Sequence, residues 1–358
     1  MRKKTLGAIG MALIFSMTGV TGCGNGENKN NKNIGISETK LNNTEASATE
    51  EAAESNVNKA TQGTEKNADK YQIVCTTFPQ YDWVRNILGD DNQTFELNLL
   101  LKNGGDLHNY QPTAEDMILI SDCDLFITVG GESDEWVEEA TKTSTNDNQK
   151  VVKLMDLVRE DILEHDHEED DDHDHDEEHE LYDEHIWLSL DEAQDIVDDL
   201  TDIIATMDKN SAREYEKNSE VYEEKLERLD EQYENVAQRA TKKALIFGDR
   251  FPFRYMVEDY HIPYYAAFDG CSAETEASFE TIAFLSGKID ELQLQSVLVM
   301  ENSDKSVAKA IIENTKDKNQ SILVMDSLQS VTMEDIEQGR TYLKAMEENL
   351  EVLKQALQ

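Results

Sequence analysis

The chain is 358 residues long, which exceeds one typical domain, and only 38% of its residues are hydrophobic, which indicates a part without a folded core. With 33 Lys and Arg against 76 Asp and Glu, its formal net charge is −43, which argues against nucleic acid as a partner and favours cations. Beyond Cys23, the cysteines show no CxxC spacing, which excludes a zinc-finger pattern and allows at most one disulfide among Cys75, Cys123 and Cys271.

The N-terminus has the features of a secretion signal. Basic residues at positions 2 to 4 precede an apolar run at 6–20, which is too short for a stable membrane span. The run ends in Val-Thr-Gly-Cys, which resembles a bacterial lipobox, in which the cysteine is diacylated and becomes the new N-terminus. We therefore expect residues 1–23 to be a lipoprotein signal peptide and Cys23 to be the lipidated residue. An ordinary signal peptide with a chance cysteine is the alternative.

Segments of β-branched residues then alternate with segments of helical apolar spacing. Residues 24–70 have almost no large apolar side chains and are predicted to be a flexible tether. Strands are expected next near 71–78, 95–101, 125–129 and 151–157, with helices near 81–89, 113–121, around Trp136 and at 190–207. This alternation is typical of a parallel sheet with helices on its faces, and such sheets bind ligands beyond the carboxyl ends of their strands.

The second half repeats the pattern. Strands are expected near 242–249, 264–268, 296–302 and 321–328, with helices near 253–261, 278–293 and 307–316 and a last helix from about Glu334 to Leu357. Between the halves, apolar residues step by four and three from Tyr222 to Ala240, which predicts one helix of roughly 45 Å over 211–241. We interpret it as a rigid link, with a coiled-coil dimer seam as the alternative. The predicted fold is α/β: two α/β lobes with mostly parallel sheets, 71–210 and 242–358, joined by this long helix.

One segment within the first lobe consists only of Asp, Glu and His. Residues 164–180 read EHDHEEDDDHDHDEEHE and hold five of the eight histidines: His165, His167, His173, His175 and His179. Imidazole and carboxylate together favour borderline divalent metals, and a segment without apolar residues cannot pack. We therefore expect a flexible accessory metal-binding loop. An acidic solvated spacer is the alternative, but it would not explain the clustered histidines.

Further candidate ligands stand mostly at strand ends. His108 follows the second strand in a glycine-rich loop, His185 follows the acidic loop, and Asp249 and Asp326 each follow a strand of the second lobe. A lone histidine is more often a structural residue, but two imidazoles with one or two carboxylates suit Zn²⁺ or Mn²⁺. The sequence contains no HExxH, GxSxG, P-loop or Rossmann glycine motif, so no common enzyme class is indicated.

Two motifs carry a resemblance to a known family. GGDLHNYQPTAED resembles the first ligand loop, and DEHIWLSL the second ligand segment, of the cluster A-I solute-binding proteins, the zinc and manganese receptors of bacterial ABC importers. The resemblance implies metal held between two lobes by His108, His185 and Asp326. At the family's third ligand position this chain has Gly248 or Arg250, neither of which can ligate. Asp249 is then the nearest candidate, and Cys271 is a further one because thiolate is a good zinc ligand.

The resemblance also implies a function. We expect a monomeric, non-enzymatic receptor, lipid-anchored outside the bacterial cell membrane, that captures Zn²⁺ and delivers it to an ABC permease and its ATPase. A manganese receptor is the alternative in the same class, but Mn²⁺ lies lowest in the affinity order and prefers oxygen. A zinc-dependent extracellular hydrolase and a surface adhesin are the alternatives from other classes.

Overall fold

The computed structural model describes residues 70–158, 183–268, 270–271 and 277–358, all within one of the chain's two compact units, Glu65–Gln358. The predicted signal peptide, Cys23, the tether up to residue 69 and the acidic loop 164–180 lie outside the described residues. None of the helices in the described ranges combines the length and apolarity that a membrane crossing requires.

The first sheet contains the four strands expected in the first half of the chain: β1 (Tyr71–Cys75), β2 (Phe95–Leu99), β3 (Leu125–Thr128) and β4 (Lys150–Lys153). They pair in the order β2-β1-β3-β4, and every ladder is parallel. Alternate residues of β1 face opposite sides, so Ile73 and Val74 are both fully buried but belong to different hydrophobic clusters. Helices must therefore cover both faces of this sheet.

The helices of this half are α1 (Phe78–Leu88), α2 (Ala114–Asp122), α3 (Trp136–Thr141), α4 (Leu154–Leu157) and α5 (Leu190–Met207). Thr113 caps α2 by accepting the Asp116 N–H at 3.2 Å, as its position predicts. Pro79 does not separate strand from helix. It lies in the first turn of α1, where the missing N–H of proline is not needed for a helical hydrogen bond.

The second sheet repeats the topology of the first. Its strands are β5 (Leu245–Phe247), β6 (Tyr264–Ala266), β7 (Ser296–Met300) and β8 (Ser321–Met325), parallel in the order β6-β5-β7-β8. The helices α7 (Arg254–Asp259), α8 (Phe279–Leu292) and α9 (Ser306–Asn314) alternate with these strands. The predicted two-lobe α/β fold with parallel sheets is therefore confirmed.

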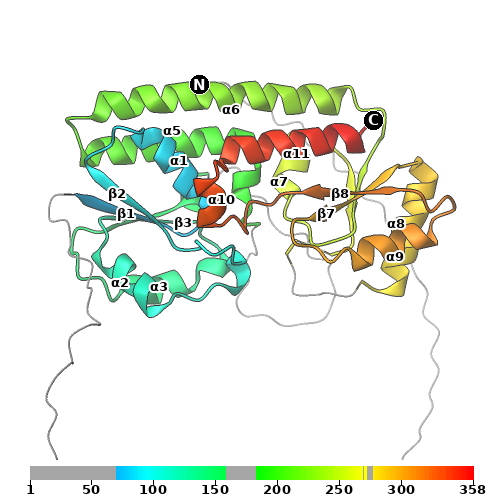
Figure 1. Cartoon of the computed structure of the whole chain (residues 1–358), viewed down its shortest axis with the longest axis horizontal. Helices are drawn as coiled ribbons and strands as arrows, with labels where there is room; N and C mark the ends of the chain where they lie inside the picture. Colours follow the sequence, from blue (N-terminus) through cyan, green and yellow to red (C-terminus); the bar gives the residue numbers. More distant parts are fainter. Residues whose placement is uncertain (1–69, 159–182, 269, 272–276) are drawn as a thin grey trace, which may run out of the picture. The chain divides into compact units, whose positions relative to one another are not determined.

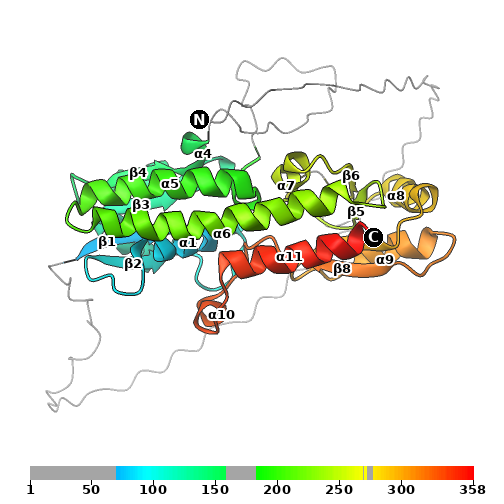
Figure 2. The ribbon, with the colours of Figure 1, turned by 90° about the horizontal axis from the view of Figure 1, so that it is seen from above.

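The long helix α6 (Ala212–Gln238) links the two lobes. It packs against α1 and α5, and against the last helix of the chain, α11 (Tyr342–Ala356). Figures 1 and 2 show α6 running beside α5 and α11, on the side of the sheets opposite to α2 and α3. Its apolar stripe is buried within the chain, and Tyr233 donates a hydrogen bond to the Met346 carbonyl at 2.6 Å. The stripe is therefore a core-facing surface and not a dimer seam.

The C-terminal segment differs from the prediction of one helix. It forms α10 (Met333–Glu337) and α11, separated by Gly339 at φ +91°. That left-handed conformation suits glycine, and Thr341 then starts a new helix by accepting the Lys344 N–H at 3.1 Å.

Candidate metal centre

His108 lies in a loop that follows β2 and contacts the second lobe. Within this loop, Gly104 has φ +71°, and a Cβ there would lie only 2.7 Å from the Ser330 carbonyl oxygen. Only glycine allows this approach. Asp106 then caps a short 3₁₀ turn, η1 (Leu107–Asn109), because its Oδ1 accepts the His108 N–H at 3.1 Å. The cap fixes the backbone from which the His108 ring projects.

His185 immediately precedes a second 3₁₀ turn, η3 (Ile186–Leu188), and is 2% exposed. Its backbone N–H donates to Asp183 Oδ1 at 2.9 Å. Two residues farther along the chain, the Trp187 indole donates to the Ser327 carbonyl at 2.9 Å and packs edge-on against the His185 ring. The segment that carries His185 is thereby attached to the loop after β8 in the second lobe.

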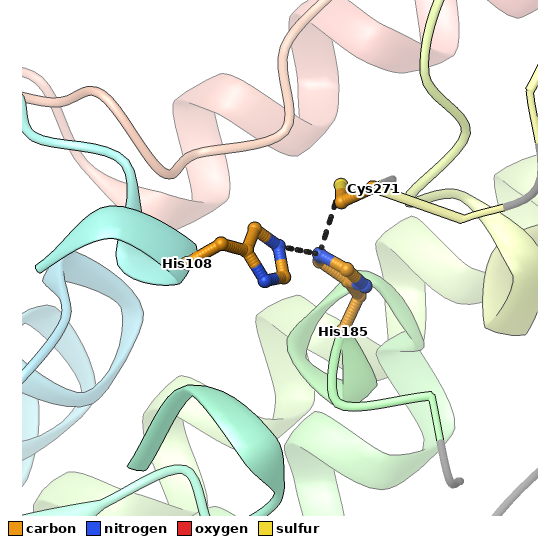
Figure 3. Close-up of side chains that lie close together, drawn as sticks. All are labelled: His108, His185 and Cys271. Carbon is orange, nitrogen blue, oxygen red and sulfur yellow. Dashed lines mark hydrogen bonds between the residues drawn. The ribbon is translucent and has the colours of Figure 1, made fainter. Parts of the chain in front are cut away.

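Cys271 completes the group from the other lobe. It lies in the loop after β6, and its Sγ is 3.3 Å from His185 Nε2. The Nε2 atoms of His108 and His185 are 3.2 Å apart, and the ligand atoms of all three residues lie within 4.8 Å of one another. Figure 3 shows the two rings and the thiol converging from three separate segments.

These separations match a tetrahedral metal site. Zn–N bonds of about 2.0–2.1 Å and a Zn–S bond of about 2.3 Å place two tetrahedral nitrogens about 3.3 Å apart, and nitrogen and sulfur about 3.6 Å apart. The contacts of 3.2 and 3.3 Å are close to both values. The distances from His185 Nε2 to His108 and to Cys271 are therefore already suited to a shared ion.

Carboxylates hold the outward nitrogen of each imidazole. His185 Nδ1 is 2.8 Å from Asp183 Oδ1, and His108 Nδ1 is 2.8 Å from the Ser133 hydroxyl and 3.3 Å from Glu184 Oε1. Ser133 in turn donates to Glu184. Asp183 and Glu184 are 1% and 5% exposed. A carboxylate behind a metal-binding histidine fixes its tautomer, so the neutral ring that binds zinc would direct its Nε2 lone pair inward.

The electrostatics of the group favour a thiolate beside a protonated imidazole. Burial raises the pKa of Cys271, but the nearby His185 and His108 outweigh it and lower that pKa to about 6. Burial lowers the pKa of His108, but Cys271 and Glu184 raise it to about 9. Cys271 and Asp183 likewise raise the pKa of His185 against the effect of burial. The thiol is therefore already in its metal-binding form at neutral pH.

The structure brings together His108 and His185 but leaves Asp326 and Asp249 outside the group. Asp326 forms an ion pair with Arg340 and accepts the Leu328 N–H at 2.8 Å. Asp249 accepts the N–H of its neighbour Arg250 at 2.9 Å and that of Met300 at 3.3 Å. Both carboxylates are thus engaged elsewhere, which differs from the sequence-based expectation.

The sequence indicates Cys271 only as a further candidate zinc ligand, and it indicates no role for Asp183 and Glu184. The sequence feature that could have identified these two carboxylates is their position directly before His185, in a segment that is otherwise apolar. No pattern links Cys271 to the histidines, because the three residues meet only through the fold. Cys75, Cys123 and Cys271 are all free thiols in the structure.

Comparisons with known proteins agree with this architecture. The ZnuA family model, described as the periplasmic component A of a zinc-uptake complex, matches residues 73–356. The high-affinity zinc uptake system protein ZnuA of Bacillus subtilis is 31% identical over 304 residues, which are 84% of this chain and 92% of that protein. The zinc-binding lipoprotein AdcA of Streptococcus pneumoniae is 30% identical over 298 residues, 81% of this chain but only 57% of AdcA. The chain thus spans little more than half the length of AdcA.

The crystal structure of the Zn(II)-bound ZnuA-like domain of S. pneumoniae AdcA has a TM-score of 0.63 and 26% identity to this chain, and the match covers 80% of this chain and 99% of that domain. Because the family model and the B. subtilis relative both match most of its length, the chain belongs to the ZnuA family.

Proposed function

We propose that this protein is an extracytoplasmic receptor that captures Zn²⁺ with His108, His185 and Cys271 and delivers it to an ABC import permease and its ATPase. The observation that carries this proposal is the convergence of the two Nε2 atoms and the Sγ atom within 4.8 Å. Membership of the ZnuA family and the zinc named in its relatives support the choice of ion.

The donor set favours zinc over manganese. Thiolate and imidazole suit Zn²⁺, whereas Mn²⁺ prefers oxygen donors and lies lowest in the divalent affinity order.

Three protein ligands leave one position of a tetrahedral ion for water or another oxygen donor. A hydrolase would need a general base beside that position. The two buried carboxylates nearest to the group, Asp183 and Glu184, instead hold the imidazoles.

The remaining parts of the proposal concern the chain outside the described residues. Lipidation at Cys23 would anchor a monomeric receptor to the outer face of the membrane, and residues 24–70 would set its reach. The five histidines of the accessory loop, residues 164–180, would add weak zinc sites that concentrate the ion near the central site. Deleting this loop should then reduce the number of ions bound at high zinc concentration and leave one tight ion, as counted by calorimetric titration.

A panel of five single variants tests the site. We expect His108→Ala, His185→Ala and Cys271→Ala each to weaken zinc binding by at least about tenfold in a chelator competition titration, since water poorly replaces a lost protein ligand. Asp326→Ala is the matched control and should bind zinc like the wild type, because its carboxylate is paired with Arg340 away from the group. Asp249→Ala tests whether that carboxylate is a ligand, and it should cost far less affinity than the loss of a ligand, because the carboxylate is bonded to the Met300 N–H.

The melting temperature of each metal-free variant confirms that it is folded. Wild-type affinity in either histidine variant would contradict the proposed site. A large loss in Asp326→Ala with none in Cys271→Ala would instead restore the carboxylate as the third ligand.

A further inference from the structure

The segment 249–251, between β5 and α7, contacts both of the loops that supply ligands from opposite lobes. On one side, Arg250 Nη1 donates to Asp106 Oδ2 at 2.7 Å. Asp106 uses its other oxygen, Oδ1, to accept the His108 N–H at 3.1 Å. Two consecutive contacts therefore connect a guanidinium of the second lobe to the backbone of a ligand in the first lobe.

On the other side, the same segment holds the loop that carries Cys271. The Phe251 N–H donates to the Gly270 carbonyl at 2.6 Å, one residue before the ligand. The Phe251 ring is 3% exposed and stacks on Tyr264 of β6 with ring centroids 4.2 Å apart. This stacking ties the backbone of the segment to the strand that leads into the Cys271 loop.

The segment is itself fixed to the second sheet. Asp249 Oδ2 accepts the Met300 N–H at the end of β7, and Asp249 Oδ1 accepts the Arg250 N–H. Arg250 and Asp106 have side chains that are 32% and 26% exposed, so their ion pair is partly shielded from water. A partly shielded, charge-assisted hydrogen bond is stronger than an exposed surface ion pair.

We propose that Arg250 is a positioning residue that holds the His108 loop of the first lobe against the Cys271 loop of the second lobe and thereby slows the release of zinc. This inference rests on the proposed function, because it assumes that His108 and Cys271 share one ion. Breaking the Arg250–Asp106 contact frees the His108 loop to move away from the second lobe. The ion then leaves sooner, while its capture by the remaining ligands is little changed.

The test is a stopped-flow measurement of zinc dissociation into excess chelator, with Arg250→Gln, Asp106→Asn and the double variant. Asparagine keeps the Oδ1 that caps His108 and removes only the charge that pairs with Arg250. We expect each single variant to release zinc roughly five times faster, in line with the loss of one charge-assisted contact. The double variant should be no faster than either single variant, because both remove the same contact.

Two controls separate positioning from general destabilisation. Arg340→Gln removes a half-buried arginine whose ion pairs with Asp326 and Glu348 lie wholly within the second lobe, and it should release zinc like the wild type. Arg250→Lys keeps the positive charge and should recover part of the slow release. The association rate and the metal-free melting temperature of Arg250→Gln should stay within error of the wild type.

An unchanged release rate in Arg250→Gln would overturn the inference, and so would additive effects in the double variant or equal acceleration in Arg340→Gln. None of these results would affect the proposed function, which is tested separately by the zinc affinity of the His108, His185 and Cys271 variants.

Discussion

At the scale of single residues, Asp183 contacts both the His185 side chain and a residue of the second lobe. Its Oδ1 accepts both the backbone N–H and the ring Nδ1–H of His185, while its backbone carbonyl accepts the Tyr255 hydroxyl at 2.8 Å. Tyr255 belongs to α7 of the second lobe. One residue thus orients a ligand of the first lobe and contacts the second.

Asp183→Asn should therefore weaken zinc binding, because the amide keeps the shape of the side chain but loses the charge that makes the imidazole a strong donor. Substitutions behind a metal-bound histidine typically cost about tenfold or more in affinity. Competition titration measures the effect, with the exposed Asp147→Asn as the control for loss of one negative charge. Equal affinities in the two variants would show that Asp183 does not tune the ligand.

The pKa values at the site predict proton release on zinc binding. At pH 7 the raised pKa of His108, about 9, keeps this imidazole protonated, whereas Cys271, with a pKa of about 6, is a thiolate. Zinc requires neutral imidazole, so its binding must expel the His108 proton. Affinity should fall as the pH falls below about 9, and more steeply below about 6, where the thiol is protonated as well. Calorimetric titration in buffers of different ionisation enthalpy measures the release, and a heat independent of the buffer would contradict it.

At this scale the sequence predicted part of the candidate site. His108 and His185 stand in recognisable segments, so they could be chosen as candidate ligands from their neighbours in the chain, and the structure brings them together. Cys271 is 86 residues from His185 along the chain, beyond α5, α6 and the first strands of the second lobe, and only the topology of the sheets brings its loop to the histidines. Asp326 follows a strand, as a ligand would, but Arg340 lies close enough to neutralise it. The position of a carboxylate at the end of a strand does not reveal which group it will contact, because that depends on the whole fold.

At the scale of elements, hydrophobic periodicity predicted all eight described strands and the long helix, because buried strands and one-sided helices both leave a clear apolar pattern. It failed at 154–157, where a continuation of the strand was expected and helix α4 forms, and between α10 and α11, where the apolar spacing continues across a break. The break depends on the backbone of Gly339, at φ +91°, and not on the distribution of apolar residues.

Two glycine substitutions test this reading of the backbone. Gly339→Ala should destabilise the fold by about 1 kcal/mol or more, since alanine tolerates positive φ poorly. Gly287→Ala, within α8, should instead stabilise it by up to about 1 kcal/mol, because alanine favours helix. A Cβ would meet nothing within 4 Å at either position, so steric clashes do not complicate the comparison. Urea denaturation of the two variants measures both changes, and a shift of the same sign in both would show that the backbone at 339 is not the cause of the break.

At the scale of the whole described unit, the two lobes share one hydrophobic core. A single buried cluster includes Ile73 and Ile127 of the first sheet and Phe247 and Leu298 of the second. The start of α11 adds polar links to the first lobe, since the Tyr342 N–H donates to Asp82 at 2.8 Å and its hydroxyl donates to the Trp187 carbonyl at 2.7 Å. The lobes are therefore held together on the side of the sheets that α6 and α11 cover, and the ligand loops lie beyond the ends of the strands.

This arrangement explains how a site can be assembled from three distant segments. A shared core fixes the two sheets relative to each other, and the loops beyond their strands then place two imidazoles and one thiolate around the same point. Because the three side chains already lie close together, little conformational freedom is lost when the ion binds, and this favours tight binding. The delivery to a permease that we propose requires that the loops later separate, and we propose that the Arg250–Asp106 contact between them controls this step.

The central claim is that one zinc ion is bound by both histidines and by the Cys271 thiolate. X-ray absorption spectroscopy of the zinc-loaded protein, with one equivalent of metal, measures this ligand set directly. We expect one sulfur at about 2.3 Å together with nitrogen and oxygen neighbours at about 2.0–2.1 Å, and loss of the sulfur contribution in Cys271→Ser. A first shell of nitrogen and oxygen alone in the wild-type protein would contradict the claim.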